Sequence, residues 1–210
     1  MSKDFGCCTL SLIEARQCIS FASRDGYPFS STYRLQLVTM SANWPETIFE
    51  HFKAADVRQV AYVPDAGHKL LIERCEADAD IHAVSLTTEE EGVAMMGGAW
   101  VGGQRGVLLL QSSGVGNCIN MLSLQHECRM PIVMLVTMRG EWGEFNPWQV
   151  AMGKSTQTAL ESAGVYVYRA DDPDDVAETV RAALNFGYNT SRMVAVLIGQ
   201  RVIGTKNFQK

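Results

Sequence analysis

The pattern of hydrophobic and polar positions divides most of the chain into short apolar runs, separated by longer segments with helical periodicity. Short apolar runs are typical of strands in a parallel sheet that is covered on both faces. The expected strands are residues 57–63, 82–86, 106–111, 131–137, 165–168 and 193–198. The expected helices are residues 44–55, 67–77, 89–103, 112–124, 153–163 and 174–185. This alternation predicts a doubly wound α/β fold, with a six-stranded parallel sheet and helices on both faces.

The first 39 residues lack both a sustained helical period and clean alternation. We expect residues 1–39 to be a weakly structured extension and residues 40–210 to be a single domain. A secretory signal is disfavoured because no apolar segment with a small-residue cleavage site follows Lys3 and Asp4.

Composition restricts the kind of partner. The net charge of -5 and the absence of a basic stripe argue against nucleic-acid binding as the main role. The longest apolar runs have the length of a strand, so no membrane span is expected. The six cysteines show no C-x-x-C spacing, which favours reduced thiols and a cytoplasmic location. We expect no metal site, since no histidine lies near Cys7, Cys8 and Cys18.

Three consecutive glutamates, Glu89, Glu90 and Glu91, open a segment that carries no charge from Gly92 to Gly103. Acidic residues in a first helical turn are commonly solvated groups that complement the helix dipole. The uncharged segment instead predicts a helix buried on all sides, with at least one carboxylate facing a crevice. Crowded, partly buried carboxylates raise one another's pKa, which acid–base chemistry requires.

The sequence SSGVGN, residues 112–117, follows the third expected strand at its carboxyl end, where ligands bind in open parallel sheets. We expect it to be a turn that opens the next helix. Its glycines Gly114 and Gly116 permit close approach of a ring or a substrate, although on this motif alone a purely structural turn is the favoured interpretation.

Three segments in this order resemble the pyrimidine-binding domain of thiamine-diphosphate enzymes: VPDAGHKLL (63–71), residues 89–120, and the MRGEWGE…PWQVAMGK stretch (138–154). Within that family they are most similar to the alpha subunit of sulfopyruvate decarboxylase and to the matching half of phosphonopyruvate decarboxylase. The similarity extends over roughly residues 44–199.

The resemblance implies that one glutamate of this helix hydrogen-bonds the N1′ nitrogen of the cofactor's aminopyrimidine. Relatives carry it ten residues before an aromatic, and counting back from Trp100 gives Glu90. Glu91 is the rival, because Gly92 follows it as a glycine follows the catalytic glutamate of phosphonopyruvate decarboxylases.

The resemblance also implies further site residues. The SSGVGN segment resembles the family's QNSGLGN loop, which makes Gly114, Gly116 and Asn117 candidate cofactor contacts and Ser113 a candidate substrate contact. This chain has Ser112 where relatives usually have Asn.

Two more segments carry candidates for the substrate side. Asp65 is a candidate catalytic group and His68 a candidate substrate contact, with a simple helix cap as the alternative for Asp65. Arg139 suits a sulfonate or phosphonate group, unless it pairs with Glu141 or Glu144.

Family members hold the diphosphate through Mg²⁺ on a GDG motif in a second domain, and this sequence contains no GDG. The resemblance therefore implies a complementary beta subunit that holds Mg²⁺ and the diphosphate of thiamine diphosphate, in a hetero-oligomer. The residues expected at that interface are Met95, Met96, Trp100, Met121, Trp142 and Trp148.

The resemblance thus predicts a subunit of a lyase that decarboxylates a small anionic 2-oxo acid such as sulfopyruvate or phosphonopyruvate, releasing CO2 and an aldehyde. A decarboxylase or carboligase for an apolar or aromatic 2-oxo acid is the alternative within the family. A noncatalytic nucleotide- or effector-binding module is the alternative outside it, although no G-x-G-x-x-G follows the first strand.

Overall fold

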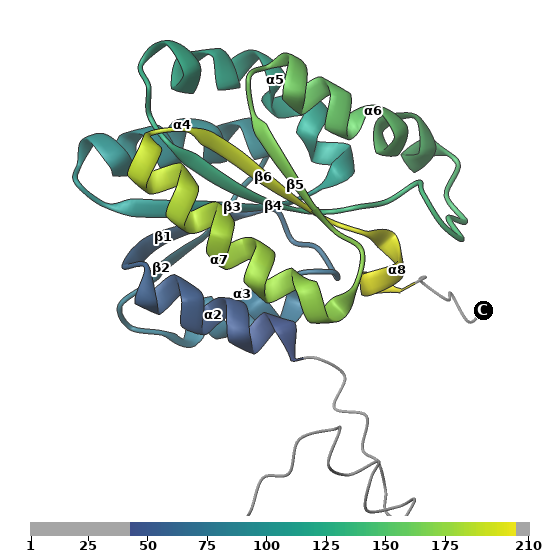
Figure 1. Ribbon diagram of the computed structural model, residues 1–210, viewed down its shortest axis with the longest axis horizontal. Helices are drawn as coiled ribbons and strands as arrows, with labels where there is room; N and C mark the ends of the chain where they lie inside the picture. Colours follow the sequence, from purple (N-terminus) through teal and green to yellow (C-terminus); the bar gives the residue numbers. More distant parts are fainter. Residues whose placement is uncertain (1–42, 205–210) are drawn as a thin grey trace, which may run out of the picture. The chain divides into compact units, whose positions relative to one another are not determined.

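The computed structural model describes residues 43–204 (Figure 1), so the expected extension over residues 1–39 lies outside the described residues. The strands are β1 (Val57–Tyr62), β2 (His82–Ser85), β3 (Arg105–Gln111), β4 (Ile132–Thr137), β5 (Tyr166–Ala170) and β6 (Met193–Ile198). The helices are α2 (Trp44–Ala54), α3 (Lys69–Ala77), α4 (Glu89–Val101), α5 (Ser112–Glu127), α6 (Trp148–Ser162), α7 (Pro173–Thr190) and α8 (Gln200–Ile203). None of these helices within residues 43–204 has the length and apolar character needed to cross a bilayer.

All six strands are parallel, in the order β2-β1-β3-β4-β6-β5, which confirms the predicted fold class. The chain passes from β1 outward to β2 and then returns to β3 on the other side of β1. The strand order therefore reverses between β1 and β3, and ligands of doubly wound sheets bind beyond the carboxyl ends of the strands at such a reversal.

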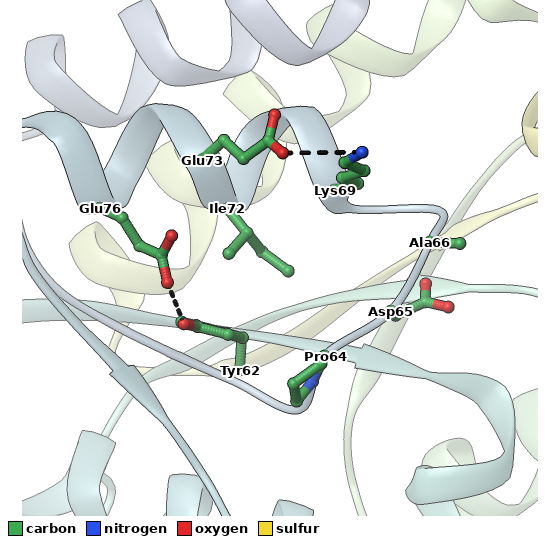
Figure 2. A pocket seen from close by; sticks show the side chains of 8 residues that line it. All are labelled: Tyr62, Pro64, Asp65, Ala66, Lys69, Ile72, Glu73 and Glu76. Carbon is green, nitrogen blue, oxygen red and sulfur yellow. Dashed lines mark hydrogen bonds and ion pairs between the residues drawn. The ribbon is translucent and has the colours of Figure 1, made fainter.

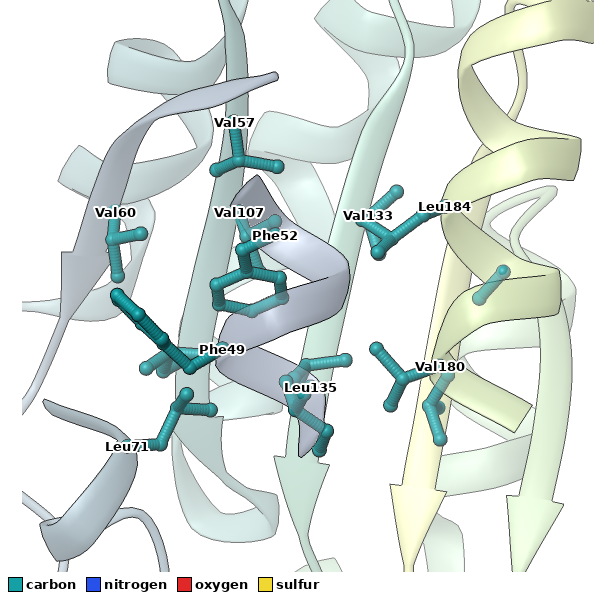
Figure 3. Close-up of a cluster of buried hydrophobic side chains, with 14 of the residues drawn as sticks. Phe49, Phe52, Val57, Val60, Leu71, Val107, Val133, Leu135, Val180 and Leu184 are labelled. Carbon is teal, nitrogen blue, oxygen red and sulfur yellow. The ribbon is translucent and has the colours of Figure 1, made fainter. Parts of the chain in front are cut away.

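Helices cover both faces of the sheet, with α2, α3 and α7 on one side and α4, α5 and α6 on the other (Figure 1). Every residue of β4 and β6 is buried, as expected of central strands between two helical layers. On the first side, Phe49 and Phe52 of α2 pack among aliphatic side chains of β1, β3 and β4 (Figure 3). The core thus anchors the strands whose ends carry the candidate site residues.

Glycines lie inside three helices where the sequence favours a turn or a helix end. The SSGVGN segment is already helical in α5, which begins at Ser112 as expected; α6 begins at Trp148 and not at residue 153, and α7 continues beyond residue 185 to Thr190. A Cβ at Gly153 would overlap the carbonyl oxygen of Arg139, and one at Gly187 would lie 3.1 Å from Val133. These glycines permit close packing and do not end a helix.

Candidate functional site

Asp65 joins three strand ends at the point where the strand order reverses. Its carboxylate accepts hydrogen bonds from Thr137 Oγ1 at the end of β4 (2.6 Å), from Gln111 Nε2 at the end of β3 (3.0 Å) and from the Gly67 N–H (3.1 Å). Ser113 Oγ donates to Gln111 Oε1 (2.9 Å) and so extends the same network. These contacts bring two candidate residues together and occupy the Asp65 carboxylate with local donors.

A cavity of about 420 Å³ lies beside this network, on the α3 side of the end of β1 (Figure 2). Its apolar surface includes Pro64 and Ile72. Its polar groups are paired with one another, since Tyr62 donates to Glu76 and Lys69 lies 3.8 Å from Glu73 (Figure 2). Lys69 is therefore the cation that lines this cavity, in an exposed ion pair with Glu73.

The three glutamates at the start of α4 have different environments. Glu89 is buried, with 9% of its surface exposed, whereas Glu90 and Glu91 are exposed. Glu89 Oε2 accepts a hydrogen bond from Asn117 Nδ2 (2.8 Å), and Glu91 Oε2 accepts one from the Thr87 N–H (2.9 Å). Among the described residues the Glu90 side chain has no hydrogen bond or ion pair, so its carboxylate is available to a ligand.

The body of α4 is not buried on all sides, which corrects the prediction from its uncharged sequence. Ala94, Gly98 and Val101 are exposed, Val101 to 78% of its surface, and they follow Glu90 along one face of the helix. The charge-free residues therefore form an exposed apolar face, defined by Ala94, Gly98 and Val101, with Glu90 at its start.

The first turns of α5 pack closely against α4 and α6. A Cβ at Gly114 would overlap the Glu89 carboxylate, and one at Gly116 would lie 3.2 Å from Met152 of α6. The side-chain amide of Asn117 already donates to Glu89. In this structure Gly114 and Asn117 thus serve contacts between helices, and a cofactor contact by Gly114, Gly116 or Asn117 stays a prediction.

His68 is fully buried, which does not support its expected contact with a substrate. Its Nε2 lies 3.0 Å from the carbonyl oxygen of Leu135, and its Nδ1 has no partner among the described residues. Burial is the main cause that lowers the pKa of His68, against the opposing charge of Asp65. A neutral His68 therefore packs beneath the strand ends.

Arg139 is also withdrawn from the surface, so the expected binding of an anionic substrate is not supported. It is 5% exposed and pairs with Glu144 through Nε (2.8 Å) and a terminal nitrogen (2.7 Å). Burial on its own raises the pKa of Glu144, but hydrogen bonds from Arg139 and from the N–H groups of Asn146 and Gly140 outweigh it and lower that pKa to about 2. The pairing with Glu144 that the sequence offered as the alternative is the one observed, and it is buried.

The Arg139–Glu144 pair organises the loop between β4 and α6. Gln200 Nε2 donates to Glu144 (3.0 Å), while Gln200 Oε1 accepts from the N–H groups of Glu141 (2.9 Å) and Trp142 (3.0 Å). At its base, the Arg139 N–H donates to Ser112 Oγ (3.0 Å), which ties the loop to the start of α5. Sequence reasoning offered Glu144 as one of two partners for Arg139, but it missed the role of Gln200 and the burial of Glu89. Glu89 had a sequence signal because it belongs to the acidic triplet, whereas Gln200 had none.

Four of the residues expected at a partner interface divide into two groups. Met96 is 1% exposed, and Trp100 is half-buried and stacks on Tyr188, so both belong to the packing of this chain. Trp142 and Trp148 remain exposed, to 47% and 77% of their surface. The loop between β4 and α6 thus buries its internal ion pair, while Trp142 of the loop and Trp148 at the start of α6 are exposed.

Comparison with known proteins places these features in a family. Residues 43–159 match the family model described as "Thiamine pyrophosphate enzyme, N-terminal TPP binding domain". The chain is 31% identical to the sulfopyruvate decarboxylase subunit alpha of Methanococcus maripaludis, over 74% of this chain and 94% of that subunit. It is 32% identical to the subunit of the same name from Methanothermobacter thermautotrophicus, over 76% of this chain and 97% of that subunit.

A longer relative is the phosphonopyruvate decarboxylase of Streptomyces viridochromogenes, which is 36% identical over 60% of this chain and 32% of its own length. Among solved structures, the fold is similar to 2-oxoglutarate:ferredoxin oxidoreductase from Magnetococcus marinus, with a TM-score of 0.59 and 13% identity over 76% of this chain and 29% of that one. The structural similarity supports the α/β fold alone.

Proposed function

The chain belongs to the family of thiamine pyrophosphate enzymes, through their N-terminal TPP binding domain. From this premise we propose that it is the alpha, pyrimidine-binding subunit of a thiamine-diphosphate-dependent decarboxylase that converts a 2-oxo acid to CO2 and an aldehyde. The observation that carries this proposal is the exposed carboxylate of Glu90, which no described residue engages, at the start of an apolar helix face.

The chemistry of the reaction is divided between the cofactor and the protein. Thiamine diphosphate, when bound, supplies the electron sink that allows a 2-oxo acid to lose CO2. Glu90 supplies a carboxyl group that shares a proton with N1′ of the aminopyrimidine. A partner that covers the apolar face of Ala94, Gly98 and Val101 excludes water from this hydrogen bond, which strengthens it.

A complementary beta subunit completes the site in this proposal. The relatives named as alpha subunits imply such a partner, and the sequence has no GDG motif of its own. No group of three or more metal-binding side chains occurs within residues 43–204. We assign Mg²⁺ and the diphosphate to the partner, so the cofactor lies across the interface of a hetero-oligomer.

Sulfopyruvate and phosphonopyruvate are the first candidate substrates, because the relatives carry their names. Arg139 is bound to Glu144, so the cation for a sulfonate or phosphonate group comes from elsewhere in the complex. The exposed Trp142 and Trp148 favour an apolar or aromatic 2-oxo acid as the second candidate. A panel that contains both kinds of 2-oxo acid distinguishes them.

The test is a pair of glutamine variants in the complex with the complementary subunit, assayed for CO2 release with thiamine diphosphate and Mg²⁺. Glu90→Gln lowers kcat at least about 100-fold and leaves assembly intact, because the amide keeps the shape of the side chain and cannot share the N1′ proton. Glu91→Gln, the matched control, keeps most activity. An active Glu90→Gln with an inactive Glu91→Gln would move the role by one residue. Full activity of both variants would contradict the enzymatic function and favour a noncatalytic module.

A further inference from the structure

The buried glutamate of α4 makes contacts that neither of its neighbours makes. Glu89 is 9% exposed and receives the Asn117 amide at 2.8 Å. A Cβ at Gly114 would overlap the carboxyl carbon and Oε1 of Glu89, so this carboxyl group lies directly against the backbone of the first turn of α5. One acidic side chain thus connects the starts of two helices.

This contact fixes how the first turn of α4 is rotated. Successive residues of a helix are separated by about 100° around its axis, so a Glu89 held inward leaves Glu90 at a different angle, where it is exposed. Glu91 Oε2 accepts a hydrogen bond from the Thr87 N–H, and this contact also holds the first turn of α4 in place. Glu90 accordingly lies on the exposed face with Ala94 and Gly98, where the proposed cofactor contact requires it.

We propose that Glu89 is a positioning residue for the decarboxylation, and this inference rests on the proposed function. Through Asn117 and Gly114 it holds the starts of α4 and α5 as one unit and thereby aims the Glu90 carboxylate at the interface. Glu89 itself does not touch the cofactor or the substrate. Its role requires a hydrogen-bond acceptor at residue 89 and a donor at residue 117, and not a negative charge as such.

This requirement can be tested by exchanging donor and acceptor. Glu89→Gln keeps an acceptor for Asn117 and retains kcat within about threefold. Glu89→Ala removes the acceptor and lowers kcat about 10- to 100-fold with little change in KM, because displacing a reacting group by about 1 Å can cost 100-fold. Asn117→Asp sets two carboxylates against each other and lowers kcat at least about 10-fold. The double variant Glu89→Gln/Asn117→Asp restores a donor–acceptor pair and recovers most of the activity lost in Asn117→Asp.

All variants are measured in the complex with the complementary subunit, with thiamine diphosphate, Mg²⁺ and the best 2-oxo acid of the panel. Recovery of kcat in the double variant supports positioning, because a purely stabilising contact would change the melting temperature and leave kcat per folded complex unaltered. An Asn117→Asp variant with wild-type kcat overturns the inference, even where Glu89→Ala fails to fold. Loss of activity in Glu90→Gln alone, with unchanged Glu89 and Asn117 variants, leaves the proposed function standing and removes this inference. Full activity of both Glu90→Gln and Glu91→Gln instead refutes the proposed function.

Discussion

At the scale of single residues, glycine was the residue type whose role the sequence pattern predicted least well. Gly114, Gly153 and Gly187 resemble helix starts or breaks in the sequence, yet each lies inside a helix where another group approaches its backbone. The sequence around a glycine does not show whether it forms a turn or makes room for a close contact. The contacting group comes from a part of the chain that is far away in the sequence. The sequence therefore indicated where these glycines matter, but not the reason.

The charged candidates show the same limit. The sequence identified the segments that meet at the strand ends, and Asp65, Ser113 and Arg139 all lie there. It did not show that the Arg139 side chain is occupied by Glu144, because pairing within a folded loop depends on tertiary contacts. The sequence identified the three acids at the start of α4. The structure was needed to show that Glu89 is buried and that Glu90 and Glu91 are exposed.

The Arg139–Glu144 pair supplies a stability prediction at this scale. Arg139→Met leaves the buried Glu144 carboxylate without its partner and lowers the free energy of unfolding by about 3–5 kcal/mol. The control is Arg181→Met, which removes an exposed ion pair with Glu178 in α7 and changes stability little. Urea unfolding of the isolated chain measures both. Equal midpoints for the two variants would show that Arg139 is free in solution, and its substrate-binding role would then be restored.

At the scale of elements, the periodicity of the sequence predicted all six strands and six of the seven described helices, with most ends within a few residues. Buried strands were the most reliable, because a short apolar run between helical segments has few other interpretations. The short α8 was missed, since its residues form only a single turn. The uncharged helix α4 was predicted as buried, because the sequence does not show which faces the chain covers by itself.

The exposed face of α4 carries a prediction about assembly. Ala94→Arg places a charge on this face and weakens binding of the complementary subunit by at least about 3 kcal/mol, or more than about 100-fold in Kd. The matched control is Ala182→Arg, an exposed alanine of α7 on the opposite side of the sheet, which leaves the Kd unchanged. Both isolated variants keep the melting temperature of the parent chain, because arginine and alanine are both good helix formers.

Sedimentation velocity with increasing amounts of the complementary subunit measures this Kd. Equal affinity of the two arginine variants would exclude the exposed face of α4 from the interface. The partner subunit would then not cover the Glu90 carboxylate. The proposed hydrogen bond from this carboxyl group to N1′ would need other support.

At the scale of the whole molecule, we propose that this chain contributes the half of the cofactor site that contacts the pyrimidine ring, and that a partner contributes the half that holds the diphosphate. The sheet brings Asp65, Ser113 and Arg139 to the carboxyl ends of its strands. At the start of α4, Glu89 packs inward while Glu90 and Glu91 are exposed. The family match and the relatives named as alpha subunits agree with a subunit that works in a complex. The division of the site between two chains is the central claim of this account.

Calorimetric titration with thiamine diphosphate and Mg²⁺ tests that claim most directly. The isolated chain makes only ring contacts, so we expect a Kd in the millimolar range at best, about -4 kcal/mol, without dependence on Mg²⁺. Addition of the complementary subunit brings the charge-assisted contacts to the diphosphate and shifts binding to the micromolar range with dependence on Mg²⁺. Micromolar, Mg²⁺-dependent binding by the isolated chain would contradict the divided site and would place a diphosphate site within this chain itself.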